Sequence, residues 1–288
     1  MKVEPAAATV TLSHGCLCGR ERHRVATVRA LTGADEIAIA TLETSSAAAR
    51  VTALLARAVE RLGPIQPVGS DVTATLTVGD REALVLHVRR LTLGDRLACM
   101  IRCPQCREPM DLDLRVSDLL LPSTPDEPVE HELDLDDGGT AYHVSFRLPT
   151  GADLEDAATV AARDGIAEAA RRILRRCVAR VTCGGDTVSL PSRLERVVST
   201  AMASRDPQAE LMLRPLCPSC GAHFEALLDA ASFLFDEIGA RVRTLFGEVH
   251  LLARHYHWSE AEILSLSPAR RHAYLSLIGE ESNAKLVR

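Results

Sequence analysis

The spacing of hydrophobic positions changes repeatedly along the chain and predicts a mixture of strands and helices. Residues 25–30 place apolar and polar side chains as a strand does, and residues 31–36 turn into a helix for which Thr32 is a suitable N-cap. Apolar residues then recur at helical spacing over 47–62, where Gly63 and Pro64 end the pattern. These patterns predict a fold of the α+β class.

Further elements lead to the first of two cysteine pairs. Residues 72–78 alternate and are rich in β-branched side chains, which predicts a strand. Asp80 is a suitable cap for a helix over 81–90. After a Gly-Asp turn, residues 97–102 lead directly to Cys103.

An acid-rich segment divides the chain near its middle. Residues 122–139 contain three prolines, a run of Asp and Glu, and a final Gly-Gly pair. Proline and glycine interrupt regular structure and like charges repel one another, so this segment is interpreted as a linker. A solvated connector or an exposed hairpin fits the composition better than an acidic binding tail.

The chain after this segment repeats the order of elements found before it. Thr32-Gly33-Ala34-Asp35 recurs as Thr150-Gly151-Ala152-Asp153, in each case three residues after an arginine, and each copy continues through helices to a Cys-Pro-x-Cys motif. Chance gives one short match more readily than the same order of strand, turn, helices and cysteine pair twice. We therefore predict two tandem, duplicated α+β units, at 21–121 and 140–236.

Beyond the second unit the pattern is purely helical. Apolar side chains form a heptad-like stripe over 233–256, which fits either a helix packed on its own domain or a helix that binds a partner. Residues 259–262 have the capping-box pattern, and Ser267-Pro268 opens a last helix. Residues 237–288 are predicted to form a helical C-terminal module.

Two Cys-Pro-x-Cys motifs carry the candidate chemistry of the chain. Each places two sulfur atoms at the i, i+3 spacing of a zinc knuckle, and together they supply Cys103, Cys106, Cys217 and Cys220. Four thiolates complete a tetrahedral Zn²⁺ shell with no open position, which is typical of a structural site. One structural zinc ion is therefore predicted, with one knuckle from each unit; a four-cysteine iron–sulfur cluster is the less favoured alternative.

The first 20 residues show neither helical nor alternating spacing and are interpreted as a flexible N-terminal arm. His14, Cys16, Cys18 and His23 in and beside this arm are candidates for a second metal site. A single C-x-C spacing without a second pair is also compatible with a plain segment, so this interpretation stays open.

Composition narrows the classes of function. The net charge of −6 does not favour a nucleic-acid-binding surface. No run has the length and apolarity of a membrane span and the start lacks a signal-peptide pattern, so a cytoplasmic protein without a membrane anchor is predicted. The sequence has no Walker loop and no GxSxG, HExxH or GxGxxG motif, so we expect no catalytic residues, no small-molecule substrate and no enzymatic activity.

Three stretches, 29–36, 91–106 and 146–153, resemble baseplate and baseplate-hub assembly proteins of contractile phage tails and contractile injection systems. Residues 256–278 look like the short helical ending common in that group. The resemblance implies a zinc-ribbon-containing, non-enzymatic protein that helps to build a baseplate or hub.

The same resemblance implies that the partners are other baseplate, hub or spike proteins, and that the chain is either retained in a phage-tail-like particle or acts as an assembly chaperone. An alternative from another class is a zinc-ribbon adaptor that binds nucleic acid or the transcription machinery. A redox protein that uses its CxxC pairs is a third possibility.

Overall fold

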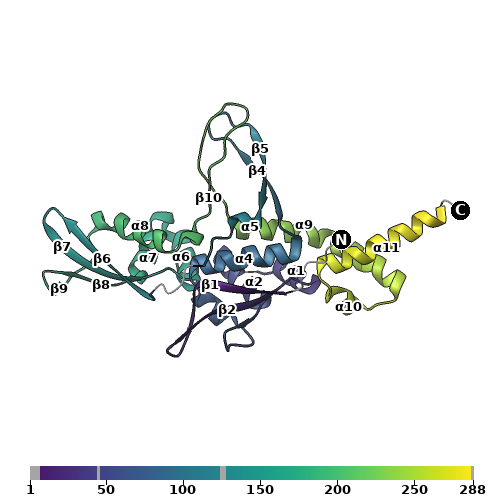
Figure 1. Cartoon of the computed structure of the whole chain (residues 1–288), viewed down its shortest axis with the longest axis horizontal. Coiled ribbons are helices and arrows are strands. Elements are labelled where there is room, and N and C mark those ends of the chain that lie inside the picture. Colours follow the sequence, from purple (N-terminus) through teal and green to yellow (C-terminus); the bar gives the residue numbers. More distant parts are fainter. Residues whose placement is uncertain (1–6, 44–45, 124–127, 287–288) are drawn as a thin grey trace.

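The chain folds into two α+β units, an arm of two hairpins that projects from the body, and a set of C-terminal helices (Figure 1). The computed structural model describes residues 7–43, 46–123 and 128–286. In Figure 1 the second unit lies on the left, the first unit in the centre and the C-terminal helices on the right. The observed class is therefore mixed α+β with a helical C-terminal region, as the sequence predicts.

The first unit is a three-stranded antiparallel sheet, in the order β1–β2–β3, packed with four helices. Thr32 caps α1 in a capping box with Asp35, which confirms the predicted start of this helix. The bounds are β1 (Ala7–Cys18), β2 (Glu21–Arg29), β3 (Val59–Leu62), α1 (Gly33–Ala40), α2 (Ala47–Ala58), α3 (Ser70–Thr75) and α4 (Val78–Leu93).

The prediction of a flexible arm over the first 20 residues is wrong for residues 7–18, and residues 1–6 lie outside the described chain. Strand β1 pairs with β2 along most of its length. Its inner face buries Val10, Leu12 and Cys16 against the core. These side chains do alternate, but the Thr and Ser between them and the inward-facing His14 weaken the contrast on which the pattern depends.

Two further predictions in this unit are wrong: the strand over 72–78 does not form, and the helix over 47–62 is shorter than predicted. Residues 70–75 form helix α3, because Thr73 is buried against α2 and its hydroxyl donates to the carbonyl of Thr52 at 3.1 Å, so tertiary packing overrides β-branched preference. The helix predicted over 47–62 ends at Ala58, since Val59–Leu62 pairs with β2 instead.

Asp80 does not cap a helix, contrary to the prediction. Thr77 caps α4, with its hydroxyl accepting the N–H of Asp80 at 3.3 Å. The Asp80 carboxylate instead accepts backbone N–H groups of β1, at 2.8 Å from Ser13 and 2.6 Å from Gly15. A side chain near a helix start thus fixes a strand that lies far from it in sequence.

The second unit is a four-stranded antiparallel sheet in the order β6–β7–β8–β9, with its own core of buried side chains. Much of the segment interpreted as a linker is strand β6, so of the two forms considered, the hairpin is the one observed; residues 124–127 lie outside the described chain. The bounds are β6 (Glu130–Asp137), β7 (Thr140–Arg147), β8 (Val178–Cys183), β9 (Asp186–Thr187), α6 (Gly151–Asp164), α7 (Ile166–Cys177), η1 (Ser192–Leu194), α8 (Glu195–Arg205) and η2 (Pro207–Ala209).

The C-terminal helices are α9 (Ala230–Tyr256), α10 (Glu260–Leu264) and α11 (Pro268–Leu286). The apolar stripe of α9 is used within the chain: Phe235 and Ile238 belong to the first unit's core, and Leu252 packs in a small cluster with α10 and α11. The observed packing therefore favours the first of the two interpretations of this stripe. None of the described helices is long and apolar enough to cross a bilayer.

Candidate metal centre

The projecting arm, which we call the cysteine arm, consists of two antiparallel hairpins that each carry one Cys-Pro-x-Cys motif (Figure 1). Strands β4 (Arg96–Arg102) and β5 (Pro109–Arg115) flank the first motif. Strands β10 (Met212–Leu213) and β11 (Ala226–Leu227) flank the second. The short helix α5 (Val116–Leu119) connects the first hairpin back to the body.

Both motifs fold into the same tight turn. The N–H of the residue after the second cysteine donates to the carbonyl of the first cysteine, at 2.9 Å from Arg107 to Cys103 and 2.9 Å from Gly221 to Cys217. These two residues have left-handed backbones, with φ of 63° at Arg107 and 72° at Gly221. A common turn places both sulfur atoms of each motif on the same side, toward the other hairpin.

The four sulfur atoms lie where one tetrahedral ion would need them. The Sγ atoms of Cys103 and Cys220 are 3.7 Å apart, and those of Cys106 and Cys217 are 3.6 Å apart. All four lie within 4.8 Å of one another. A tetrahedral ion with metal–sulfur bonds of about 2.3 Å requires S···S separations of about 3.8 Å, which the two shorter separations match, so the four cysteines could hold a metal ion.

The electrostatics of the four thiols favour a bound cation. Hydrogen bonds from the backbone N–H groups of Cys220 and Ser219 lower the pKa of the Cys217 thiol to about 6. At Cys106 the N–H of Glu108 acts in the same direction, yet desolvation and the neighbouring thiols raise the pKa to about 12. Four thiolates this close repel one another, and a divalent ion removes that repulsion.

The second metal site considered at the N-terminus does not form. Cys16 is buried in the first unit's core and Cys18 is exposed. The Nε2 atom of His14 lies 3.7 Å from a carboxylate oxygen of Asp206. Within the described part of the chain, the arm cysteines are the one group of three or more candidate ligands that come together. His223, beside the second motif, is exposed and is not a member of that group.

Three further cysteines lie outside the four-cysteine cluster. Cys99 and Cys177 are buried, and burial raises the pKa of both thiols. Cys183 is only partly buried.

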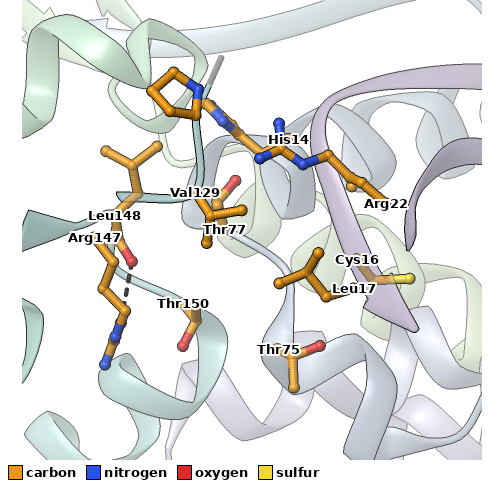
Figure 2. A pocket seen from close by; sticks show the side chains of 12 residues that line it. His14, Cys16, Leu17, Arg22, Thr75, Thr77, Val129, Arg147, Leu148 and Thr150 are labelled. Atoms are coloured by element: carbon orange, nitrogen blue, oxygen red, sulfur yellow. Dashed lines mark hydrogen bonds between the residues drawn. The ribbon is translucent and has the colours of Figure 1, made fainter. Parts of the chain in front are cut away.

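The sequence patterns gave no sign of a polar junction between the two units. Asp80 accepts a hydrogen bond from a backbone N–H of the β1 hairpin. Asp206, which belongs to the second unit, accepts the N–H of Gly79 in the first unit at 2.8 Å. A cavity of about 250 Å³ lies beside this junction (Figure 2). Leu17 reaches it from the hairpin and Leu148 from the second unit.

The chain is thus an α+β protein whose candidate site is a cluster of four cysteines on a projecting arm. The family model described as "T4 bacteriophage base plate protein" matches residues 17–235. The match covers most of the chain, so the protein belongs to this baseplate family, which confirms the resemblance seen in the sequence. No curated protein and no solved structure matches.

Proposed function

We propose that this protein is a non-enzymatic structural or assembly component of the baseplate or hub of a contractile tail or injection system, stabilised by one structural zinc ion. The family match over residues 17–235 is the main support for this role. The proposed partners are other baseplate, hub or spike proteins. The chain either stays in the finished particle or acts as an assembly chaperone.

The zinc ion of this proposal is held by Cys103, Cys106, Cys217 and Cys220. The ion supplies the positive charge that lets all four thiols ionise, and four protein ligands leave no position for a reactive water. Structural zinc sites in small peptides contribute roughly 10 to 16 kcal/mol of binding free energy at neutral pH. An ion of that affinity would be a major part of the stability of the cysteine arm.

We further infer that the two units are copies of one ancestral unit. Support comes from the Arg–Asp contact at each Thr-Gly-Ala-Asp turn, which is 2.6 Å both from Arg29 to Asp35 and from Arg147 to Asp153. Each unit also contributes one hairpin with the same cysteine turn. If this is so, the two cysteine pairs are far apart in sequence because each copy supplies one of them.

Metal analysis of the purified full-length protein tests the zinc proposal. We expect about one zinc ion per chain, and loss of the metal in the Cys103→Ser/Cys217→Ser variant, because two ligands cannot close a tetrahedral shell. Cys18→Ser is the matched control, since Cys18 is exposed and outside the cluster. A double variant that kept both its metal and its melting temperature would refute the shared site.

Assembly in the producing cell tests the role. Deletion of the gene should abolish complete contractile particles in electron micrographs, and the wild-type gene should restore them. Mass spectrometry of purified particles then separates a retained component from a chaperone. Normal particles in the deletion strain, or retention on heparin that falls steeply with salt, would contradict the proposal and favour the nucleic-acid adaptor.

A further inference from the structure

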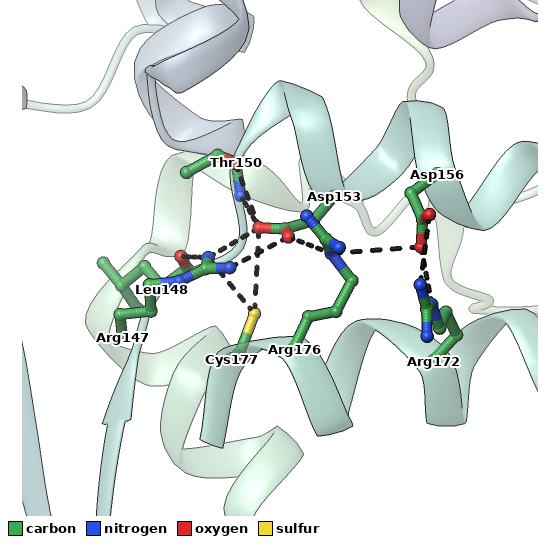
Figure 3. Close-up of polar contacts among 8 residues, drawn as sticks. All are labelled: Arg147, Leu148, Thr150, Asp153, Asp156, Arg172, Arg176 and Cys177. Carbon is green, nitrogen blue, oxygen red and sulfur yellow. Dashed lines mark hydrogen bonds and ion pairs between the residues drawn. The ribbon is translucent and has the colours of Figure 1, made fainter. Parts of the chain in front are cut away.

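Two turns of the same sequence start helices α1 and α6, and each is rigidly built. We call them the acceptor turns: Thr32–Asp35 and Thr150–Asp153. The aspartate of each forms a capping box with the threonine. It is also held by an arginine from the preceding strand, Arg29 in the first turn and Arg147 in the second (Figure 3 shows the second).

Each acceptor turn binds the backbone just ahead of another helix. The N–H of Gly33 donates to the carbonyl of Leu266 at 3.2 Å, and the N–H of Gly151 donates to the carbonyl of Leu76 at 3.1 Å. Each leucine directly precedes the serine or threonine that comes before the first residue of a helix, α11 in one case and α4 in the other. The same backbone contact is thus made twice, by segments far apart in sequence.

The fourth residue of each incoming helix is an arginine that lies on the glycine of the turn. A Cβ atom added at Gly33 would lie 2.8 Å from Nη1 of Arg271. A Cβ atom added at Gly151 would lie 2.2 Å from Nη1 of Arg81. A side chain at either position would force the guanidinium group to shift from its buried, hydrogen-bonded place, so both positions favour glycine.

We call each contact between an acceptor turn and its incoming helix a joint. In the first joint, formed by Thr32–Asp35 and α11, the Arg271 side chain is completely buried and all its hydrogen-bond partners are acceptors. It donates to the Leu266 carbonyl at 2.8 Å and to the Glu248 carboxylate at 2.8 Å. Both carboxylate oxygens of Glu36, on the helix that follows the turn, lie 3.3 Å from Nη2. The planar fork of arginine can reach all three groups at once, whereas the single ammonium of lysine cannot.

Arg81 is equally enclosed in the second joint, with only 2% of its surface exposed. It donates to the carbonyl groups of Ala48 and Thr73, both at 2.8 Å, and to the Thr52 hydroxyl at 3.0 Å. Glu155, from the helix that follows the second turn, contacts the same hydroxyl. The guanidinium group is again matched by acceptors on several sides.

A short helix precedes each incoming arginine helix and packs on the acceptor side. These are α10 beside α1 in the first joint and α3 beside α6 in the second. Leu264, at the end of α10, also approaches Gly33. Each incoming segment is therefore a short helix, a leucine, a serine or threonine, and a helix with arginine in fourth place.

We propose that the acceptor turn is a binding site for helix starts of the pattern Leu-Ser/Thr-x-x-x-Arg, and that this chain fills two such sites with its own segments. The first unit's site binds residues 264–271 of the C-terminal helices, and the second unit's site binds residues 76–81 of the first unit. A segment of the same chemistry supplied from outside competes for the first site. This proposal does not rest on the zinc ion or on the baseplate role.

Glycine substitution in the full-length protein tests the site itself, with hydrogen exchange as the readout. Gly33→Ala should speed exchange at least tenfold in residues 31–37 and 258–280 and leave residues 140–205 unchanged. Gly151→Ala should instead speed hydrogen exchange in residues 70–81 and 148–155. Gly247→Ala is the control, because a Cβ there meets no atom within 4 Å.

Equal exchange in Gly33→Ala and Gly247→Ala would overturn the proposal. Trp258 gives a second readout, since it is the single tryptophan of the chain and stacks on Tyr256 with ring centroids 4.9 Å apart. Its emission should shift to longer wavelength in Gly33→Ala but not in Gly151→Ala.

Binding from outside is tested on the full-length Arg271→Ala variant. A synthetic peptide of residues 258–276 should displace the variant's own segment and restore protection of residues 31–37, because only the peptide carries the arginine. The same peptide with Arg271→Ala is the matched control and should restore none. Equal protection by the two peptides, or none by either, would overturn the proposal.

Discussion

Asp153 illustrates at the residue scale how a buried charge depends on its partners. It is fully buried and accepts hydrogen bonds from Arg147 at 2.6 Å, Arg176 at 2.7 Å and the Thr150 N–H at 2.9 Å (Figure 3). Burial alone would raise the pKa of Asp153, but Arg147 and Thr150 lower it well below its ordinary value. The charged form is therefore the one that the folded protein stabilises.

Replacement of Asp153 by asparagine should lower the free energy of unfolding by about 3 kcal/mol at pH 7, because it leaves two arginines without their carboxylate. A lowered pKa in the folded state contributes stability above the unfolded value of about 3.9, and that contribution is lost as the pH falls. Urea unfolding at several pH values between 7 and 2 should thus show a weaker acid dependence in Asp153→Asn than in the wild type.

Asp156→Asn is the control for this experiment. Asp156 forms an ion pair with Arg172 at the surface, where solvent screens the charges and the pair contributes little to stability. An acid dependence in Asp153→Asn equal to that of the wild type would contradict the assignment of this stability to Asp153.

Residue-scale predictions succeeded where the signal was local. Thr32 was identified as a cap from its neighbours, and the arm cysteines from their i, i+3 spacing. Asp80 failed the same test, because its partners lie on β1, more than sixty residues away in sequence. Cap rules describe adjacent residues and cannot anticipate a distant strand.

At the element scale, the two hairpins of the cysteine arm differ in how many residues their strands pair. Strands β4 and β5 pair over seven residues each, whereas β10 and β11 pair over two. A two-stranded hairpin is marginal in water even when it is long, so the second hairpin has little to hold it apart from the metal site and its contacts with the first.

Removal of the metal should therefore open the hairpins unequally. We expect chelation to raise hydrogen exchange in residues 211–228 strongly and in residues 96–102 and 109–115 only weakly, because the longer ladder keeps its own hydrogen bonds. Exchange mass spectrometry with and without a zinc chelator measures both, and added zinc should reverse the change. Equal opening of the two hairpins would show that the metal supports both to the same degree.

Element-scale errors have a common physical cause. Strands β1 and β3 and helix α3 were missed or mistaken because their identity depends on a neighbour: β3 forms where β2 offers an edge, and α3 forms where α2 buries Thr73. Helices α9 to α11 were predicted well, because a helix satisfies its hydrogen bonds within its own segment.

At the scale of the whole molecule, the two units meet directly as well as through the cysteine arm. The N–H of Val78 donates to the carbonyl of Pro149 at 3.1 Å, and Asp206 binds Gly79. Helix α6 of the second unit also packs on α2 and α3 of the first. The proposed zinc ion is thus one of several connections between the units.

Calorimetry of the metal-free protein should then show a single unfolding transition, at a lower temperature than the zinc-loaded protein. Direct contacts keep the units coupled, while loss of the ion removes stability that binding contributes to the folded state. The zinc-loaded protein scanned under the same conditions is the reference. Two resolved transitions after chelation would mean that the metal alone couples the units.

The sequence by itself determined the features that rest on neighbouring residues. These are the capped turn at Thr32, the two cysteine turns and the helical C-terminus. Each depends on interactions within a few positions of the chain, so spacing and residue type carry the information.

Only the tertiary structure decided how these parts meet. It added β1 to the first sheet, and it placed Arg271 and Arg81 on the glycines of the two acceptor turns. Such contacts join residues that are far apart in sequence, and their geometry depends on the packing of whole units. No local pattern in the chain specifies that packing.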